Sequence, residues 1–330
     1  MHHEARAFWL RHPGCGEIRT ERLAEPGPDE VRVRTLYSGV SRGTETLVFR
    51  GGVPESQYAL MRAPFQDGEF PGPVKYGYLN VGVVEAGSAN LLGRTVFCLY
   101  PHQTGYVVPA SAAIPVPDDV PPSRAVLAGT VETAVNALWD AAPLIGDRVA
   151  VVGAGMVGCA VAGVLARLPG ARIQLVDVDP SRADVARALG VDFALPEQAA
   201  GECDLVIHAS ATSAGLQRCL ELAAAEGTII ELSWYGDRDV TIRPGESFHS
   251  RRLTIRSSQV GAIAPARRRN RSFADRLALA LDLLRNPAFD ALITGESRFD
   301  DLPDVLGQLA DGTLAALCQL ITYPESETHV

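Results

Sequence analysis

Three glycines spaced as G-x-G-x-x-G could bind the phosphates of a nucleotide. They come directly after the apolar run Arg148–Val152 and open a second apolar run, Met156–Leu168. Because the first run is typical of a strand and the second of a helix, the glycines can form a tight turn that brings a pyrophosphate against the backbone. Backbone N–H groups and the helix dipole then attract the phosphates. The residues of this predicted dinucleotide site are Gly153, Gly155, Met156, Val157 and Gly158.

An acidic residue follows at the distance that such a site needs. Asp177 lies about 20 residues after Gly158, at the end of the next predicted strand. There a carboxylate can bind both ribose hydroxyls of the adenosine half, and it would repel a 2′-phosphate. The sequence therefore predicts NAD(H) as the cofactor, in preference to NADP(H).

The elements that must position these residues are predicted from Arg148 onward, where strand and helix patterns alternate strictly. Predicted strands cover 148–152, 172–178, 205–209, 228–234 and 253–257, and predicted helices cover 156–168, 180–189 and 213–225. The alternation favours right-handed crossovers and a parallel, doubly wound sheet. His208 lies inside one of the apolar strands, so we interpret it as a hydrogen-bonded core residue.

The first part of the chain, up to about Pro117, has a different pattern. Short alternating runs at 31–37, 78–85, 95–100 and 106–109 are broken by Gly and Pro, which predicts β-rich structure with a long loop over 51–77. A helix is predicted over Ser123–Trp139. Beyond Gly261 we expect helices over 273–284 and 302–309, and strands near Leu292 and toward Thr322. A length of 330 residues fits two domains at about 150 residues each.

Composition and charge exclude several classes of protein. With 47% hydrophobic and 21% charged residues, the chain is globular and not disordered. A net charge of −9 argues against nucleic-acid binding, and the basic run Arg267–Arg271 is interpreted as a solvated loop. The uncharged stretch Val149–Ala166 contains four glycines, so no membrane span is predicted. Six cysteines without a C-x-x-C pair, and no signal peptide, predict a cytoplasmic protein.

The chain resembles the medium-chain dehydrogenase/reductase superfamily over nearly its whole length. The resemblance rests on Gly39–Glu45 and Thr130–Ala134, together with the glycine motif described above. Within the superfamily, Ser38–Glu45 and Phe248–Arg252 look most like the bacteriochlorophyllide dehydrogenase branch. The resemblance implies an α/β fold with a GroES-like β-rich catalytic domain (1–125 and 262–330) and a doubly wound Rossmann domain (126–261). It also implies a homodimer formed through the Rossmann sheet edge near Leu253–Ser257.

The chain departs from the zinc-dependent members of this superfamily at each metal position. The first cysteine ligand corresponds to Ser41 or Arg42, the Gly-His-Glu motif corresponds to Gly77–Leu79, and the third ligand falls near Ala128. The segment Gly87–Cys98 is too short for the four-cysteine structural zinc lobe. Because zinc sites need three or four such ligands, we predict a protein without metal.

Without zinc, another group must polarise a carbonyl or hold a proton during hydride transfer. The resemblance places Tyr78 at the position of the metal-binding histidine and Thr133 beside the nicotinamide. Hydroxyl, imidazole and carboxylate groups are the remaining candidates, and His102 is expected in a loop at the edge of the active-site cleft. The predicted catalytic residues are Ser41, Tyr78, His102, Thr133 and Glu132.

The resemblance also extends the list of cofactor residues beyond the glycine turn. The loop from Leu232 to Tyr235 and the segment from Ser258 to Val260 should flank the nicotinamide. If Trp234 and Tyr235 line the substrate pocket, a flat or hydrophobic small molecule fits best. The additional predicted cofactor residues are Arg42, Arg182, Ser210, Leu232, Trp234, Ser258 and Val260.

The sequence thus predicts an NAD(H)-dependent oxidoreductase without zinc that interconverts a secondary alcohol and a ketone. One alternative is the reduction of an activated C=C bond in an enone or quinone, and another is a non-catalytic NADH-binding sensor. The segment Gly39–Gly43 also fits the G-x-S-x-G motif of hydrolases, but it lies in irregular β structure, far from the doubly wound sheet that such a serine requires.

Overall fold

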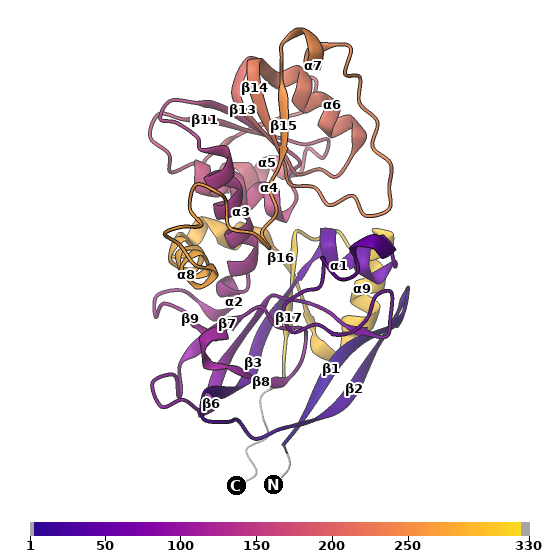
Figure 1. Ribbon diagram of the computed structural model, residues 1–330, viewed down its shortest axis with the longest axis vertical. Coiled ribbons are helices and arrows are strands. Elements are labelled where there is room, and N and C mark those ends of the chain that lie inside the picture. The colour runs from indigo at the N-terminus through magenta and orange to yellow at the C-terminus, as the bar shows by residue number, and fades with distance from the viewer. Residues whose placement is uncertain (1–2, 325–330) are drawn as a thin grey trace. The chain divides into compact units, whose positions relative to one another are not determined.

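The computed structural model describes residues 3–324, which fall into two compact units (Figure 1). One unit comprises the chain up to Gly129 together with the chain from Ile293 onward, and the other is the continuous segment Thr130–Leu292. The boundaries expected at 125 and 261 differ from these, because residues 262–292 cluster with the second unit. In that segment Arg276 is buried against Glu132, and Phe289 lies against Gly163.

Six strands in the described part of the second unit form a parallel sheet, in the order β12-β11-β10-β13-β14-β15. They are β10 (Arg148–Val152), β11 (Arg172–Val176), β12 (Asp192–Ala194), β13 (Cys203–His208), β14 (Ala223–Glu231) and β15 (Thr254–Ser257). The residues Val149–Val152 of β10 are all buried, as expected for a central strand covered on both faces. The predicted α/β class with a doubly wound parallel sheet is confirmed.

Each of these strands except β12 is followed along the chain by a helix. They are α4 (Met156–Leu165), α5 (Arg182–Leu189), α6 (Ser213–Leu222), α7 (Ser247–Ser250) and α8 (Phe273–Leu283). Figure 1 shows β13, β14 and β15 side by side, with α6 packed against β13 and β14. Helix α5 begins at Arg182 and not at Pro180, because Asp179 Oδ1 accepts hydrogen bonds from the backbone and hydroxyl of Ser181 and so stabilises a preceding turn.

The helix predicted over Ser123–Trp139 is divided into two. The structure has α2 (Pro122–Ala125) and α3 (Ala128–Ala141), with a turn at Val126 and Leu127 between them. Both turn residues are buried, so their apolar side chains continue the hydrophobic pattern through the break. Hydrophobic pattern alone therefore could not locate this turn.

The first unit is β-rich, as predicted. Strands β16-β17-β3-β6-β7-β9 form one sheet, with β8 paired to β3, and β2-β1-β5-β4 form a second sheet. The strands are β1 (His3–His12), β2 (Cys15–Leu23), β3 (Glu30–Ser41), β4 (Asp67–Gly68), β5 (Val74–Lys75), β6 (Asn80–Gly87), β7 (Thr95–Cys98), β8 (Gly105–Pro109), β9 (Ile114–Pro115), β16 (Ile293–Arg298) and β17 (Cys318–Thr322). Helices α1 (Arg42–Phe49) and α9 (Leu302–Asp311) pack against each other.

Candidate functional site

The glycine turn between β10 and α4 has the backbone geometry of a phosphate cradle. Gly153 has a φ of +107°, and a Cβ there would lie 2.6 Å from the backbone nitrogen of Ser210. A Cβ on Gly158 would overlap the carbonyl oxygen of Gly153. A Cβ on Gly155 would meet no atom within 4 Å, so the space in front of the α4 N-terminus is open. The turn therefore fits the pyrophosphate of a dinucleotide.

Asp177 stands beside this turn and fixes its shape. Its Oδ2 accepts a hydrogen bond from the backbone N–H of Ala154 at 2.6 Å, and its Oδ1 accepts one from the backbone N–H of Asp179 at 2.9 Å. A carboxylate has further lone pairs available for two ribose hydroxyls. Arg182 is half-buried at the start of α5, where its Nε lies 3.2 Å from Asp179 Oδ2.

Ser210 lies on the far side of the glycine turn, at the end of a buried polar cluster. Its Oγ is 2.6 Å from His208 Nε2, and His208 Nδ1 is 2.7 Å from Glu231 Oε2. Tyr235 donates its phenol hydrogen to Glu231 Oε2. Burial acts to raise the pKa of Glu231. The hydrogen bond and charge of His208, and the hydrogen bonds from Ser233, outweigh this effect and hold the pKa below its ordinary value. His208 is fully buried with both ring nitrogens bonded, as predicted for a core histidine.

The loops after β14 and β15 end at this same edge of the sheet. The backbone N–H of Leu232 bonds to the carbonyl of His208, while Trp234 is half-buried. The hydroxyl of Ser258 donates to Asp140 at 2.6 Å, and the carbonyl of Val260 accepts from Arg276 at 2.5 Å. The carboxyl edge of a parallel sheet is where ligands bind in this class of fold, so these predicted cofactor residues lie on the expected side.

The carboxylate of Glu132, one of the predicted catalytic residues, is bound to an arginine. It is 3% exposed, and its Oε1 accepts a hydrogen bond from Arg276 Nε at 3.0 Å. Burial raises the pKa of Glu132, although the charge and hydrogen bond of Arg276 oppose this. The residue next to it, Thr133, is half-buried on α3.

In the first unit, Ser41 and Tyr78 come together around a residue that the sequence interpretation did not select. Glu45 Oε1 accepts the backbone N–H of Ser41 at 2.7 Å. Burial and the negative charge of Glu45 raise the pKa of the Tyr78 phenol, and hydrogen bonds with Ser41 and Thr44 offset only part of this rise. Tyr78 thus remains a neutral hydrogen-bond donor at neutral pH.

His102 joins this group from a buried position in the loop between β7 and β8. It is 1% exposed, and its Nδ1 lies 2.7 Å from Ser38 Oγ. Its Nε2 lies 2.8 Å from Glu45 Oε2, and Ser38 Oγ is also 2.8 Å from the phenol of Tyr323. Buried groups with every nitrogen bonded are suited to holding their neighbours in place.

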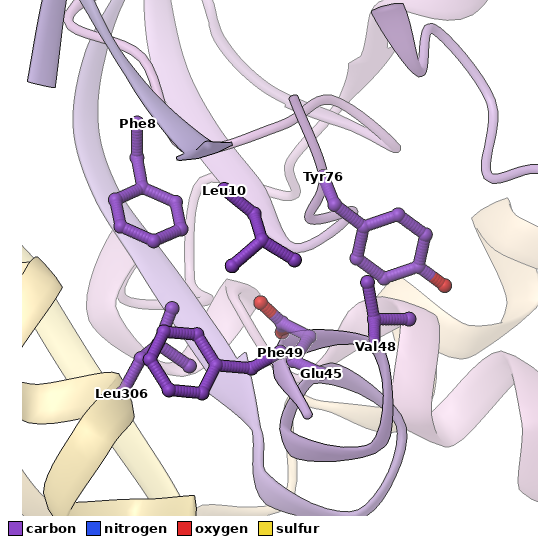
Figure 2. Close-up of a pocket in the computed structure, with 7 residues that line it drawn as sticks. All are labelled: Phe8, Leu10, Glu45, Val48, Phe49, Tyr76 and Leu306. Atoms are coloured by element: carbon purple, nitrogen blue, oxygen red, sulfur yellow. The ribbon is translucent and has the colours of Figure 1, made fainter. Parts of the chain in front are cut away.

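The rest of the surroundings of Glu45 are apolar. Figure 2 shows its carboxylate at a cavity of about 10 Å³ lined by Phe8, Leu10, Val48, Phe49, Tyr76 and Leu306. This volume is about the least that one water molecule needs, so the cavity has no room for a substrate. Arg42, in contrast, is exposed at the first position of α1.

The residues missed from the sequence are those whose role depends on distant contacts. Glu45 contacts His102 across 57 positions, and Arg276 contacts Glu132 across 144. Neither pair has a local motif, although a charged residue within an apolar helix face, such as Arg276 in α8, is a usable indication of a buried ion pair.

The described residues also bear on metal binding and on membrane insertion. Among residues 3–324 there is no group of three His, Cys, Asp or Glu side chains arranged to hold a metal ion. In the same part of the chain, none of the helices combines the length and the apolar character that crossing a membrane requires.

Two curated dehydrogenases are similar in sequence to this chain. L-idonate 5-dehydrogenase (NAD(P)(+)) of Escherichia coli K12 is 24% identical over 238 residues, which cover 67% of this chain and 65% of the relative. L-threonine 3-dehydrogenase of Deinococcus radiodurans is 34% identical over 226 residues, 58% of this chain and 61% of the relative. The chain therefore spans less than two thirds of either relative's length. No protein-family model matches the chain.

Solved structures share the fold over almost the whole chain. A protein of Escherichia coli CFT073 described as a short chain alcohol dehydrogenase, complexed with NADH, has a TM-score of 0.76 and 18% identity, covering 97% of this chain and 99% of that one. A protein of Sinorhizobium meliloti 1021 bound to NADP has a TM-score of 0.77 and 18% identity, with the same coverage.

The predicted resemblance is thereby confirmed. The chain has the fold of the medium-chain dehydrogenase/reductase superfamily, with a parallel Rossmann-like sheet and a separate β-rich unit. Its two curated relatives described above are dehydrogenases by name.

Proposed function

We propose that this chain is an NAD(H)-dependent oxidoreductase that interconverts a secondary alcohol and a ketone without zinc. The observation that carries the proposal is the glycine turn, where Gly155 leaves open the space before α4 and Asp177 stands alongside. The two curated relatives are dehydrogenases by name, and one solved neighbour holds NADH. A bound nicotinamide would supply or accept the hydride.

NAD(H) is the proposed form of the cofactor. The carboxylate of Asp177 is oriented by two backbone N–H groups, so it is placed to accept the hydrogens of ribose hydroxyls. A 2′-phosphate would bring negative charge against this carboxylate, which disfavours NADP(H).

Tyr78 is the proposed group that polarises the substrate carbonyl. Its phenol is held by Ser41 and Thr44, and its raised pKa keeps the proton on the oxygen. A neutral phenol can donate a hydrogen bond to a carbonyl or alkoxide without ionising first. In this proposal Ser41 positions Tyr78 through its hydrogen bond with the phenol, and His102 acts by positioning through Glu45; neither contacts the substrate. Thr133 is proposed to contact the nicotinamide, and Arg42 the cofactor.

The remaining expectations concern substrate class, assembly and compartment. A half-buried Trp234 beside the cofactor edge supports a flat or hydrophobic small molecule as substrate. Strand β15 ends the sheet order, which supports a homodimer formed through this edge. All six cysteines are free thiols, which supports a cytoplasmic protein. Neither nucleic acid nor membrane is a proposed partner.

The test is NADH oxidation, followed at 340 nm, by chelator-treated protein with matched saturated ketones and α,β-unsaturated carbonyls, small and polycyclic. We expect turnover of ketones, and we expect Tyr78→Phe to lower kcat about 100-fold with little change in KM, because the ring is retained and the donor is lost.

Other results would select the alternatives. Turnover confined to enones or quinones would identify a C=C reductase and reject the ketone reaction. Tight NADH binding without turnover of any substrate would identify a sensor protein. Full activity of Tyr78→Phe on ketones would reject Tyr78 as the polarising group.

A further inference from the structure

Three polar residues lie one helical turn apart on a single face of α3. Glu132, Asn136 and Asp140 occupy positions i, i+4 and i+8, which align along one side of a helix. Glu132 and Asn136 are 3% and 1% exposed, and the side chain of Asp140 is 7% exposed. We refer to these three residues as the polar face of α3. Burying a polar group costs free energy unless the group is hydrogen-bonded. The hydrogen bonds of these three residues therefore indicate what the polar face of α3 holds in place.

The polar face of α3 binds the loop 258–264, which follows β15. Asn136 Oδ1 accepts the backbone N–H of Ala264 at 3.0 Å, and its Nδ2 donates to the carbonyl of Gln259 at 3.4 Å. Asp140 accepts the hydroxyl of Ser258 at 2.6 Å. The backbone N–H of Ser258 also bonds to the carbonyl of Glu231. Both ends of the loop are thus attached to fixed elements.

Arg276 of α8 completes the attachment in the middle of the loop. Its Nη2 donates to the carbonyl of Val260 at 2.5 Å, and its Nη1 donates to the carbonyl of Ala262 at 3.4 Å and to Asn136 Oδ1 at 2.5 Å. Its Nε donates to Glu132. One planar guanidinium, 1% exposed, therefore joins α3, α8 and two loop carbonyls.

This arrangement is not the most economical way to stabilise a core. Replacing a buried ion pair by packed apolar side chains is often neutral or stabilising, so the pair is weak evidence for stability alone. Apolar side chains cannot, however, hold two carbonyl groups at fixed positions. The loop lies at the carboxyl edge of a parallel sheet, where a ligand binds, and a preorganised loop lowers the entropy cost of binding.

We infer that Arg276 is a positioning residue for the nicotinamide half of the cofactor, acting through the loop 258–264. The inference rests on the proposed function, since that loop is the segment proposed to flank the nicotinamide. The adenosine half would be held by Asp177 and the glycine turn, which make none of the bonds just described. Loss of Arg276 should therefore affect the two halves of the cofactor differently.

The experiment compares NADH with ADP-ribose, which lacks the nicotinamide, by isothermal titration calorimetry. Arg276→Lys keeps the charge opposite Glu132 but cannot reach the two carbonyls and Asn136 together. We expect this variant to weaken NADH binding about tenfold, the size of effect that follows from losing charge-assisted hydrogen bonds. ADP-ribose binding should change by less than about twofold. Asn136→Ala, an uncharged second variant, should give the same difference between the ligands.

Leu277→Ala is the matched control, because Leu277 is buried on the same helix and makes none of the loop bonds. It should lower the melting temperature without changing the ratio of the two affinities. Equal weakening of both ligands in Arg276→Lys and Asn136→Ala, or no weakening, would overturn the inference. If the wild-type protein binds neither ligand, the proposed function itself fails, and the inference fails with it.

Discussion

The carboxylate of Asp177 accepts hydrogen bonds from two backbone N–H groups, that of Ala154 in the glycine turn and that of Asp179 just after β11. It therefore has a structural role in the glycine turn as well as the proposed role in cofactor choice. Asp177→Asn removes the charge and keeps the shape, but it retains only one of these two hydrogen bonds, because the amide has one acceptor oxygen in place of two.

We predict that Asp177→Asn lowers NADH affinity about tenfold and raises relative affinity for NADPH, because one charge that repels a 2′-phosphate is lost. The ratio of the two dissociation constants, measured by NADH and NADPH fluorescence, reports the change. Asp184→Asn on the exposed side of α5 is the control, since it changes the net charge equally. An unchanged ratio in Asp177→Asn would reject the proposed NAD(H) preference.

At the residue scale, local motifs could be predicted and distant pairings could not. Gly153, Gly155, Gly158 and Asp177 were recognisable because a strand, a turn and a helix are continuous in sequence. The roles of His102 and Glu132 were not, because each depends on a residue from another part of the chain, Glu45 and Arg276 respectively. A histidine in a proline-flanked loop has the same local sequence whether it is exposed or buried.

At the scale of the elements, two glycines in the turn between β10 and α4, Gly155 and Gly158, have different structural roles. Gly158 lets α4 approach the carbonyl of Gly153, whereas Gly155 leaves open space at the helix N-terminus. The two positions thus provide a matched pair of Gly→Ala variants in one turn.

We predict that Gly155→Ala keeps the melting temperature within a few degrees but weakens NADH binding at least about tenfold, since the methyl group occupies the approach of the pyrophosphate. Gly158→Ala should lower both the melting temperature and the affinity for NADH, because α4 must move away from β10. Thermal denaturation and calorimetry measure the two effects. A Gly155→Ala protein that binds NADH normally would exclude this turn as the phosphate site.

Element type was easier to predict than element ends. The central strands β10 and β13 of the parallel sheet are apolar runs that are almost entirely buried, and their pattern is strong. The break between α2 and α3 and the assignment of 262–292 to the second unit were missed, because buried residues continue across the break and because Arg276 attaches α8 to α3.

At the scale of the whole molecule, the protonation state of the cysteine thiols supports the proposal that the protein binds no zinc. A cysteine must lose its proton to bind zinc. Burial raises the pKa of Cys98, Cys159 and Cys318 to about 12 each. It also raises the pKa of Cys219. The chain thus presents few thiolates at neutral pH.

We predict that the protein, purified without chelator, contains far less than one zinc atom per chain by elemental analysis. Addition and removal of zinc should leave its melting temperature unchanged, since no folding energy depends on the metal. A relative of the zinc-dependent type, measured in parallel, provides the positive control. Stoichiometric zinc that survives dialysis would contradict the prediction.

The pairing of β3 with β17 determines when the first unit can finish folding. Ser41 lies opposite Cys318 in this antiparallel pair, and all of the second unit lies between them in sequence. Closing so long a loop is slow, and proteins rich in such distant pairings fold slowly. On the ribosome, the second unit can therefore complete its sheet first, although its sequence starts later than β3. Until then residues 37–41 of β3 stay unpaired on the side that β17 will cover, since β8 pairs only with residues 30–34 there. Such an open strand edge is exposed to wrong pairing and to chaperones during synthesis.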